Sequence, residues 1–188
     1  MISASKFYAI LNKLKRKSLI AEHVINLGGR GGMSTFLEIS KAGCEEISMP
    51  VKPHLTRGGN AITDVFVFKL SEHLKGVIPD CRISIEKEIQ GKWIDLVLEF
   101  INQPFILGVE LELCDANLKS NIEHGVERVE FLIEACISEQ IMSKACEIVK
   151  GLPVEKQNKI AICLLTRLLK CQKLSEVVDS QILKERNL

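Results

Sequence analysis

Two consecutive strand-like segments of this chain place acidic residues within apolar runs. Residues 92–99 (KWIDLVLE) carry Asp95, and residues 106–113 (ILGVELEL) carry Glu110 and Glu112. A carboxylate buried among apolar side chains costs free energy unless it is paired, hydrogen-bonded or bound to a cation. Glu110 and Glu112 share one face because side chains alternate along a strand, and a neighbouring antiparallel strand can bring Asp95 close to Glu110. The pattern therefore predicts a site for Mg²⁺ or Mn²⁺.

The composition is that of a globular protein with a core. Of the 188 residues, 46% are hydrophobic and 26% are charged, and the formal charge is only +1, so bulk charge does not indicate nucleic-acid binding. The distribution of charge is more informative. Residues 1–57 contain nine Lys or Arg against four Asp or Glu, whereas the rest of the chain contains 16 against 20. The basic head is therefore the better candidate for contact with a polyanion.

The cysteines and the N-terminal residues indicate a cytoplasmic protein without a membrane span. The cysteines form an odd set with no C-x-x-C pair, which predicts reduced and mostly buried thiols: Cys44, Cys81, Cys114, Cys136, Cys146, Cys163 and Cys171. Basic residues interrupt any apolar stretch near the N-terminus, so no secretory signal is predicted. No run approaches the roughly 18 apolar residues that cross a bilayer.

The basic head is predicted to fold as helix, hairpin and helix. Apolar residues recur at helical spacing over 3–17, which predicts a helix capped by Ser3 or Ser5. Two β-rich segments flank the glycine-rich stretch 27–32, and Ser40 is placed to cap a short second helix. This order resembles the second half of a winged helix-turn-helix, although the one or two helices that normally come first are missing. Either a partner supplies the missing core, or the chain is the C-terminal part of a longer protein. The resemblance implies DNA contacts by Lys6, Lys13, Arg16, Lys17 and Arg30.

Composition and periodicity divide the chain into a partial winged helix at 1–48, a linker at 49–58 and an α/β domain at 59–188. The second domain is predicted to open with a helix that ends near Gly76 and Pro79. Strands follow at 81–89, 93–100 and 105–113, with turns at Gln90-Gly91 and at 102–104, then a helix at 118–127 and a strand at 128–136. A helix at 138–150, a strand at 159–168 and a final helix at 175–186 complete the prediction.

An αβββαβ order with an acid on the second strand and an acid pair on the third resembles the PD-(D/E)xK, or restriction-endonuclease-like, superfamily. Within it, residues 109–112 and 119–123 are similar to domains that follow a winged helix in proteins of mobile elements and DNA-translocating ATPases. The implied fold is a mixed sheet flanked by helices. The implied partners are DNA, a second copy of the chain in a homodimer, and an upstream ATPase domain or ATPase partner.

The resemblance also implies roles for individual residues. Asp95, Glu110 and Glu88 would hold Mg²⁺ or Mn²⁺, and the catalytic set would be completed by Glu112 and Lys119. Glu112 stands where the superfamily motif has its lysine, so an active enzyme would need a lysine from elsewhere. Lys119 could reach back from the following helix, and Lys92 is a weaker substitute.

Several alternatives remain open from the sequence. Glu88 and Glu72 fit solvated surface positions as well as a metal shell, and Glu112 could be an outward-facing polar residue. The carboxylates could also be a remnant in a nuclease fold that has lost activity. Two functions follow: a metal-dependent DNA nuclease, or a catalytically inactive DNA-binding or regulatory module that keeps the fold.

Overall fold

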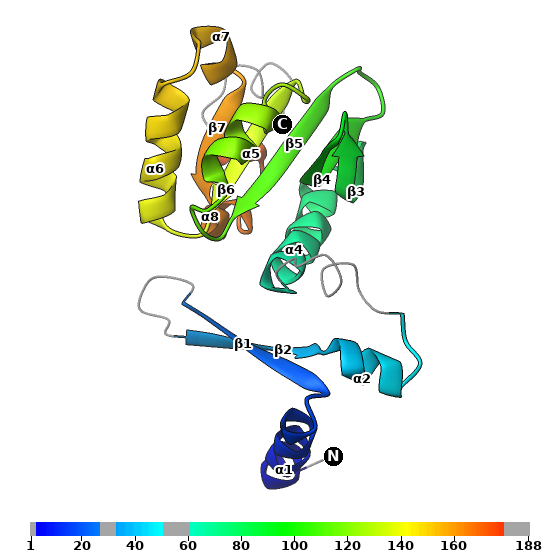
Figure 1. Cartoon of the computed structure of the whole chain (residues 1–188). Helices are drawn as coiled ribbons and strands as arrows, with labels where there is room; N and C mark the ends of the chain where they lie inside the picture. The colour runs from blue at the N-terminus through cyan, green and yellow to red at the C-terminus, as the bar shows by residue number, and fades with distance from the viewer. Residues whose placement is uncertain (1–2, 27–32, 51–60, 179–188) are drawn as a thin grey trace. The chain divides into compact units, whose positions relative to one another are not determined.

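The computed structural model describes residues 3–26, 33–50 and 61–178 (Figure 1). The chain divides into two compact units, Met1–Asp64 and Val65–Leu188. Most of the predicted linker at 49–58 lies outside the described residues. Among the described residues, no helix has both the length and the apolar character that a membrane span requires.

The first unit has the predicted order of helix, hairpin and helix. Helix α1 (Ala4–Arg16) is followed by strands β1 (Ile20–Asn26) and β2 (Met33–Ile39), which pair antiparallel, and by helix α2 (Lys41–Glu46). Both helices start at a serine, as expected for N-caps: Ser3 Oγ accepts from Lys6 N and Ser40 Oγ accepts from Gly43 N. The predicted hairpin tip, including Arg30, lies outside the described residues.

The second unit begins with helix α4 (Ala61–Val77) and an antiparallel meander. The meander consists of β3 (Cys81–Ile89), β4 (Lys92–Phe100) and β5 (Ile106–Glu112). Gln90 and Gly91, which join β3 to β4, both have positive φ angles, 50° and 80°. A two-residue hairpin loop of this kind matches the right-handed twist of the strands. The turn predicted at these residues is therefore confirmed.

Parallel strands complete the sheet. Helix α5 (Leu118–Gly125) leads to β6 (Phe131–Cys136), and helices α6 (Glu139–Lys150) and α7 (Val154–Gln157) lead to β7 (Ile160–Leu164). The strand order is β3-β4-β5-β6-β7, with β5, β6 and β7 parallel to one another. The mixed α/β fold class and the αβββαβ order are confirmed.

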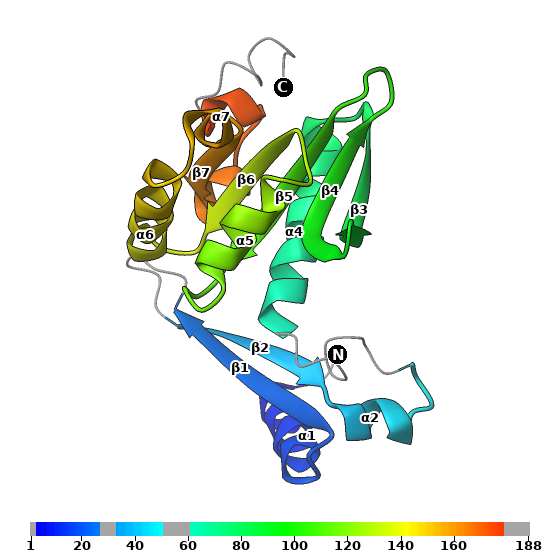
Figure 2. The same cartoon turned by 45° about the horizontal axis from the view of Figure 1, so that its top comes forward.

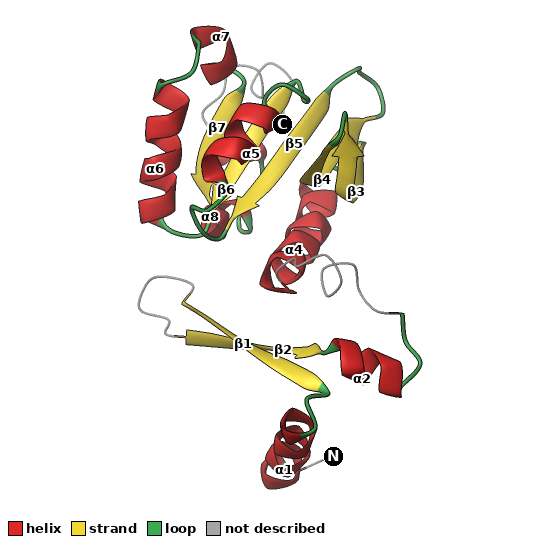
Figure 3. Cartoon of the chain, viewed as in Figure 1, coloured by secondary structure: helices red, strands yellow, loops and turns green. Residues whose placement is uncertain are grey.

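Helices cover both faces of this sheet (Figures 2 and 3). Helix α5 lies in front of the sheet in these views, with α6 to its left beside β7, whereas α4 lies behind the sheet. On the α5 side, Leu118 and Ile122 pack with Cys136 and with Ala145 of α6. The site described below lies on this α5 side of the sheet.

The C-terminal part differs from the prediction. The strand predicted at 159–168 ends at Leu164 and continues as helix α8 (Leu165–Leu168). It ends there because Leu164 pairs with Cys136, the last residue of β6, so no partner backbone continues the ladder. The final helix predicted at 175–186 is a 3-10 helix, η1 (Leu174–Glu176), in its described part. Helix α7 was not predicted, because four residues after a proline carry too little periodicity.

Candidate functional site: a buried carboxylate cluster

Asp95 and Glu110 lie opposite each other on adjacent strands. Leu96 pairs with Val109, so the antiparallel register brings Asp95 to the position across from Glu110. Asp95 Oδ2 accepts a hydrogen bond of 2.8 Å from Leu111 N, which fixes the carboxylate over β5. The charge of Asp95 raises the pKa of Glu110, so the two carboxyl groups are neighbours on this face of the sheet.

Glu110 and Glu112 are both buried, at 3% exposure each. Gly108, which shares their face of β5, lies against Val129 and Leu132, in the core on the α5 side. Asn121 of α5 donates from Nδ2 to Glu112 Oε1 at 2.8 Å. Glu112 therefore points into the molecule, beneath α5, and the alternative of an outward-facing residue is wrong.

Glu134 is a fourth carboxylate that the sequence analysis missed. It is the parallel register partner of Glu110, it lies at the centre of β6, and its exposure is 0%. The signal was present in residues 131–136 (FLIEAC), where one acid interrupts an apolar strand just as Asp95 does. Its importance depends on the parallel pairing of β5 with β6, which the sequence pattern alone does not specify.

Burial raises the pKa values of all four carboxyl groups. For Asp95 the pKa rises to about 6, mainly through burial and against the hydrogen bond from Leu111. The pKa of Glu110 is well above its ordinary value because of burial and the charge of Asp95. Burial and the charge of Glu112 likewise raise the pKa of Glu134. The pKa of Glu112 is raised by burial, although the hydrogen bond from Asn121 lowers it.

The side chains of Glu112 and Glu134 interact with each other. This interaction contributes to the pKa shifts of both groups, lowering that of Glu112 and raising that of Glu134. Neither oxygen of Glu134 has a hydrogen-bond partner of regular geometry, and Glu110 Oε1 also lacks one. Such orphaned buried oxygens are costly unless a proton or a cation satisfies them.

The cluster fits a hard divalent cation in its chemistry. Carboxylate oxygens are the ligands that Mg²⁺ and Mn²⁺ prefer, and three of the buried oxygens have no hydrogen-bond partner of regular geometry. Within the described ranges 3–26, 33–50 and 61–178, however, no three His, Cys, Asp or Glu side chains already stand in an arrangement that could hold a metal ion. Cation binding would therefore require the carboxylates to converge.

Lys119 and Lys92 differ in their exposure and in their contacts with this cluster. Lys119 Nζ is 3.8 Å from Glu123 Oε1, and its side chain is 72% exposed. Lys92 is half-buried, donates from Nζ to Asn121 Oδ1 at 2.7 Å, and lowers the pKa of Asp95, Glu110 and Glu112. The catalytic role of Lys119 stays a prediction, whereas Lys92 is the lysine whose charge acts on the cluster.

The other acidic candidates lie on or near the surface. Glu88 is exposed and pairs across the ladder with Trp93, and its metal role stays a prediction. Glu72 forms an ion pair with Lys75 at 2.5 Å. Glu86 has a positive φ of 47°, and its charge contributes to the raised pKa of Asp95. Like Glu134, Glu86 is therefore an acidic neighbour of the cluster that was not assigned to the site from the sequence.

The predicted DNA-binding residues of the first unit are exposed. Lys6, Lys13, Arg16 and Lys17 lie on or directly after α1, a helix with no buried residue. Lys15 differs, because it is ion-paired with Glu22 of β1. Large apolar side chains of α1 are also exposed, among them Phe7 and Tyr8, which contact each other edge to face.

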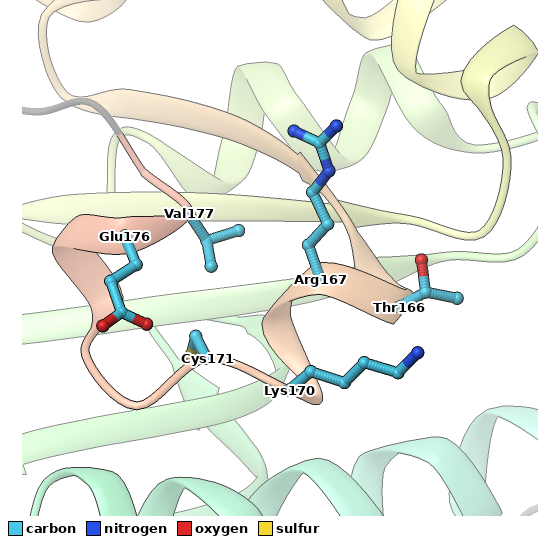
Figure 4. A pocket seen from close by; sticks show the side chains of 6 residues that line it. All are labelled: Thr166, Arg167, Lys170, Cys171, Glu176 and Val177. Carbon is cyan, nitrogen blue, oxygen red and sulfur yellow. The ribbon is translucent and has the colours of Figure 1, made fainter.

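A separate surface pocket is formed by α8, the turn after it and η1 (Figure 4). Its lining residues are Thr166, Arg167, Lys170, Cys171, Glu176 and Val177. Figure 4 shows the side chains of Arg167 and Lys170 pointing in different directions, with Glu176 on the opposite side. Its charged groups do not converge on one point. All seven cysteines, including Cys171, are free thiols, as predicted.

Comparison with known proteins adds little to this geometry. No family model matches the sequence, and no curated protein matches it. Among solved structures, the chain is similar to a chain in the complex of a CdiA-CT toxin from Burkholderia pseudomallei E479 with its cognate CdiI immunity protein. The sequence identity is 17% and the TM-score is 0.32, over 51% of this chain and 92% of that chain. Similarity at this level is too low to transfer an activity or a partner.

Proposed function

We propose that this chain is a DNA-binding protein whose second unit hydrolyses phosphodiester bonds with the help of Mg²⁺ or Mn²⁺. The observation that carries the proposal is the alignment of Asp95, Glu110 and Glu134 across three neighbouring strands, with orphaned oxygens on Glu110 and Glu134. Asp95 and Glu110 would hold the cation, with Glu134 beside them. When bound, the cation would polarise the phosphoryl group and lower the pKa of a water molecule.

The remaining residues of the site shape its environment. Asn121 fixes Glu112 beneath α5, and the apolar residues Leu118 and Ile122 of the same helix are buried against the sheet. In a site with little water, charges act over a given distance more strongly than they do in solvent. These features support phosphoryl chemistry at the cluster.

DNA is proposed as the substrate because of the first unit. Lys6 and Lys13 of α1 and its C-cap Lys17 occupy positions i, i+7 and i+11, which fall on one side of the helix. A row of exposed cations on a helix beside a hairpin suits contact with a phosphate backbone.

The proposal is tested by divalent-cation-dependent nicking of supercoiled and branched DNA. We expect Asp95→Asn and Glu110→Gln to abolish nicking and also the rise in Tm that Mg²⁺ produces. Glu99→Gln is the matched control, because Glu99 lies on β4 but is paired with Lys87 at 2.6 Å. Protein that stays inert on duplex, branched and single-stranded DNA with both cations would show that the proposal is wrong.

A second candidate is a non-catalytic DNA-binding module. It is favoured by one specific observation, namely that Glu112 stands at the motif position of the lysine and is already engaged by Asn121. This function predicts salt-dependent DNA binding that requires Lys13 and Arg16 and is indifferent to Asp95. Combining substitutions of both kinds in one mutant cycle separates the two functions.

A further inference from the structure

A chain of hydrogen bonds joins a lysine to the carboxylate cluster. Lys92, the first residue of β4, donates from Nζ to Asn121 Oδ1 at 2.7 Å, and Asn121 Nδ2 donates to Glu112 Oε1 at 2.8 Å. The three residues come from β4, α5 and β5, and 29 positions separate Lys92 from Asn121 in the sequence. Only the packing of α5 on the sheet brings them together.

The location of Lys92 makes it the positive counterpart of the cluster. Its ammonium group is joined through Asn121 to Glu112, which shares one face of β5 with Glu110. Lys92 is also half-buried, and an ammonium group in that position interacts more strongly than one in solvent. The side chain of Lys119, by contrast, is 72% exposed and lies beside Glu123.

We infer that Lys92 supplies the positive charge of this site and that Asn121 is the residue that positions it. The inference rests on the proposed phosphodiester hydrolysis. In that reaction a water oxygen bonds to phosphorus and one P–O ester bond breaks. The two protons of the water end on the new phosphate group and on the leaving alcohol, or in solvent. Negative charge develops on the phosphoryl and leaving oxygens, where the ammonium of Lys92 stabilises it.

Asn121 positions the ammonium group of Lys92 because its side-chain amide can accept one hydrogen bond and donate another. The carbonyl oxygen accepts from Lys92 while the amino group donates to Glu112, so the orientation of each partner depends on the other. A leucine at this position has the same number of side-chain heavy atoms in the same branched arrangement but forms neither bond. Asn121→Leu therefore frees the lysine without opening a large cavity.

The experiment compares Lys92→Met with Lys119→Met, two substitutions that remove the same charge. The first measurement is the titration of the site carboxyl groups by NMR in metal-free protein. We expect Lys92→Met to raise the pKa values of Asp95, Glu110 and Glu112, and Lys119→Met to leave them unchanged. The second measurement is single-turnover cleavage of DNA, where Lys92→Met should lower the rate about 100-fold or more and Lys119→Met about twofold at most.

Two further variants separate charge from structure. Lys92→Arg keeps the charge and should retain the carboxyl pKa values and part of the cleavage rate. Asn121→Leu should lower kcat while the Kd for DNA stays unchanged. If Lys119→Met shifts the carboxyl titrations, or if Lys92→Met shifts neither titration nor rate, the inference is wrong. If the wild-type protein does not cleave, the proposed function fails, and the titration alone then decides whether Lys92 carries the charge of the site.

Discussion

The carboxyl groups of Asp95, Glu110, Glu112 and Glu134 oppose folding when all of them are ionised. The pKa shift of Asp95, from 3.8 to about 6, corresponds to about 3 kcal/mol between its two protonation states. Lys92 offsets part of this cost, but one cation faces four carboxylates. Proteins keep such an arrangement at functional sites more often than elsewhere, because an apolar strand would be more stable.

Glu134→Gln should change how stability depends on pH. The pKa of Glu134 in the folded protein is raised above its ordinary value of 4.5. A group of this kind contributes stability that is present below the unfolded-state pKa and is lost as the pH rises through the folded-state pKa. Without divalent cations, the wild-type Tm should therefore fall between pH 5 and pH 8, and Glu134→Gln should fall less. At pH 8 the variant should melt a few degrees higher, at about 2–4 °C per kcal/mol.

The measurement is thermal unfolding by circular dichroism in buffers that contain a chelator. Glu147→Gln is the control, because it removes the same charge from an exposed residue of α6 that lies outside the cluster. A wild-type Tm that is flat or rising over this pH range would mean that Glu134 is not a strained, buried acid. Added Mg²⁺ should raise the wild-type Tm more than that of Glu134→Gln, because a cation relieves the same repulsion.

Close packing between elements decides where α2 lies. A Cβ atom added at Gly43 would meet the carbonyl oxygen of Leu19 at 2.1 Å. Ser40 N also donates to Leu19 O at 3.0 Å, so the start of α2 is held against the residue that precedes β1. Backbone atoms cannot move away as a flexible side chain can, and only glycine fits this contact.

Gly43→Ala should therefore destabilise the first unit by more than about 1 kcal/mol. Native-state hydrogen exchange measures this effect, with faster exchange expected at the β1 and β2 amides and no change in β5 or β6. Gly76→Ala is the matched control, since nothing lies within 4 Å of the added Cβ and alanine favours a helix by about 1 kcal/mol at most. Equal effects of the two substitutions would contradict the close approach at Gly43.

At the level of the whole molecule, the two units have net charges of opposite sign. Residues 1–57 contain nine basic against four acidic residues, whereas the rest of the chain contains 16 against 20 and includes the buried carboxylates. Under the proposed function, the net positive charge of the N-terminal part would attract a polyanion.

Replacing Lys13 and Arg16 together with Gln should weaken DNA binding and its salt dependence. The slope of log K against log salt is negative, and each lost phosphate contact makes it less steep by about 0.9. Fluorescence anisotropy over a range of salt concentrations measures this slope. Lys144→Gln is the control, because Lys144 lies in the second unit and is ion-paired with Asp115. A slope that becomes less steep by the same amount in the control would place the DNA contact elsewhere.

The order of elements could be predicted because each one carries its own local signal. Helical spacing, serine caps and the Gln90-Gly91 turn indicated α1, α2 and the β3–β4 hairpin, and the elements were found there. The prediction failed where an apolar run continued beyond the end of the partner strand. The strand at 159–168 kept its apolar character past Leu164, but its partner strand ended, and the helix α8 replaced it.

By itself the sequence determined the mixed α/β class and the three acids of β4 and β5, because strand periodicity and the cost of buried charge are local properties. Only the tertiary structure decided which groups join them. Parallel pairing of β5 with β6 set Glu134 beside Glu110, and the packing of α5 brought Asn121 between Lys92 and Glu112. Such neighbours depend on register and helix docking, which connect residues far apart in the chain and leave no periodic trace in it.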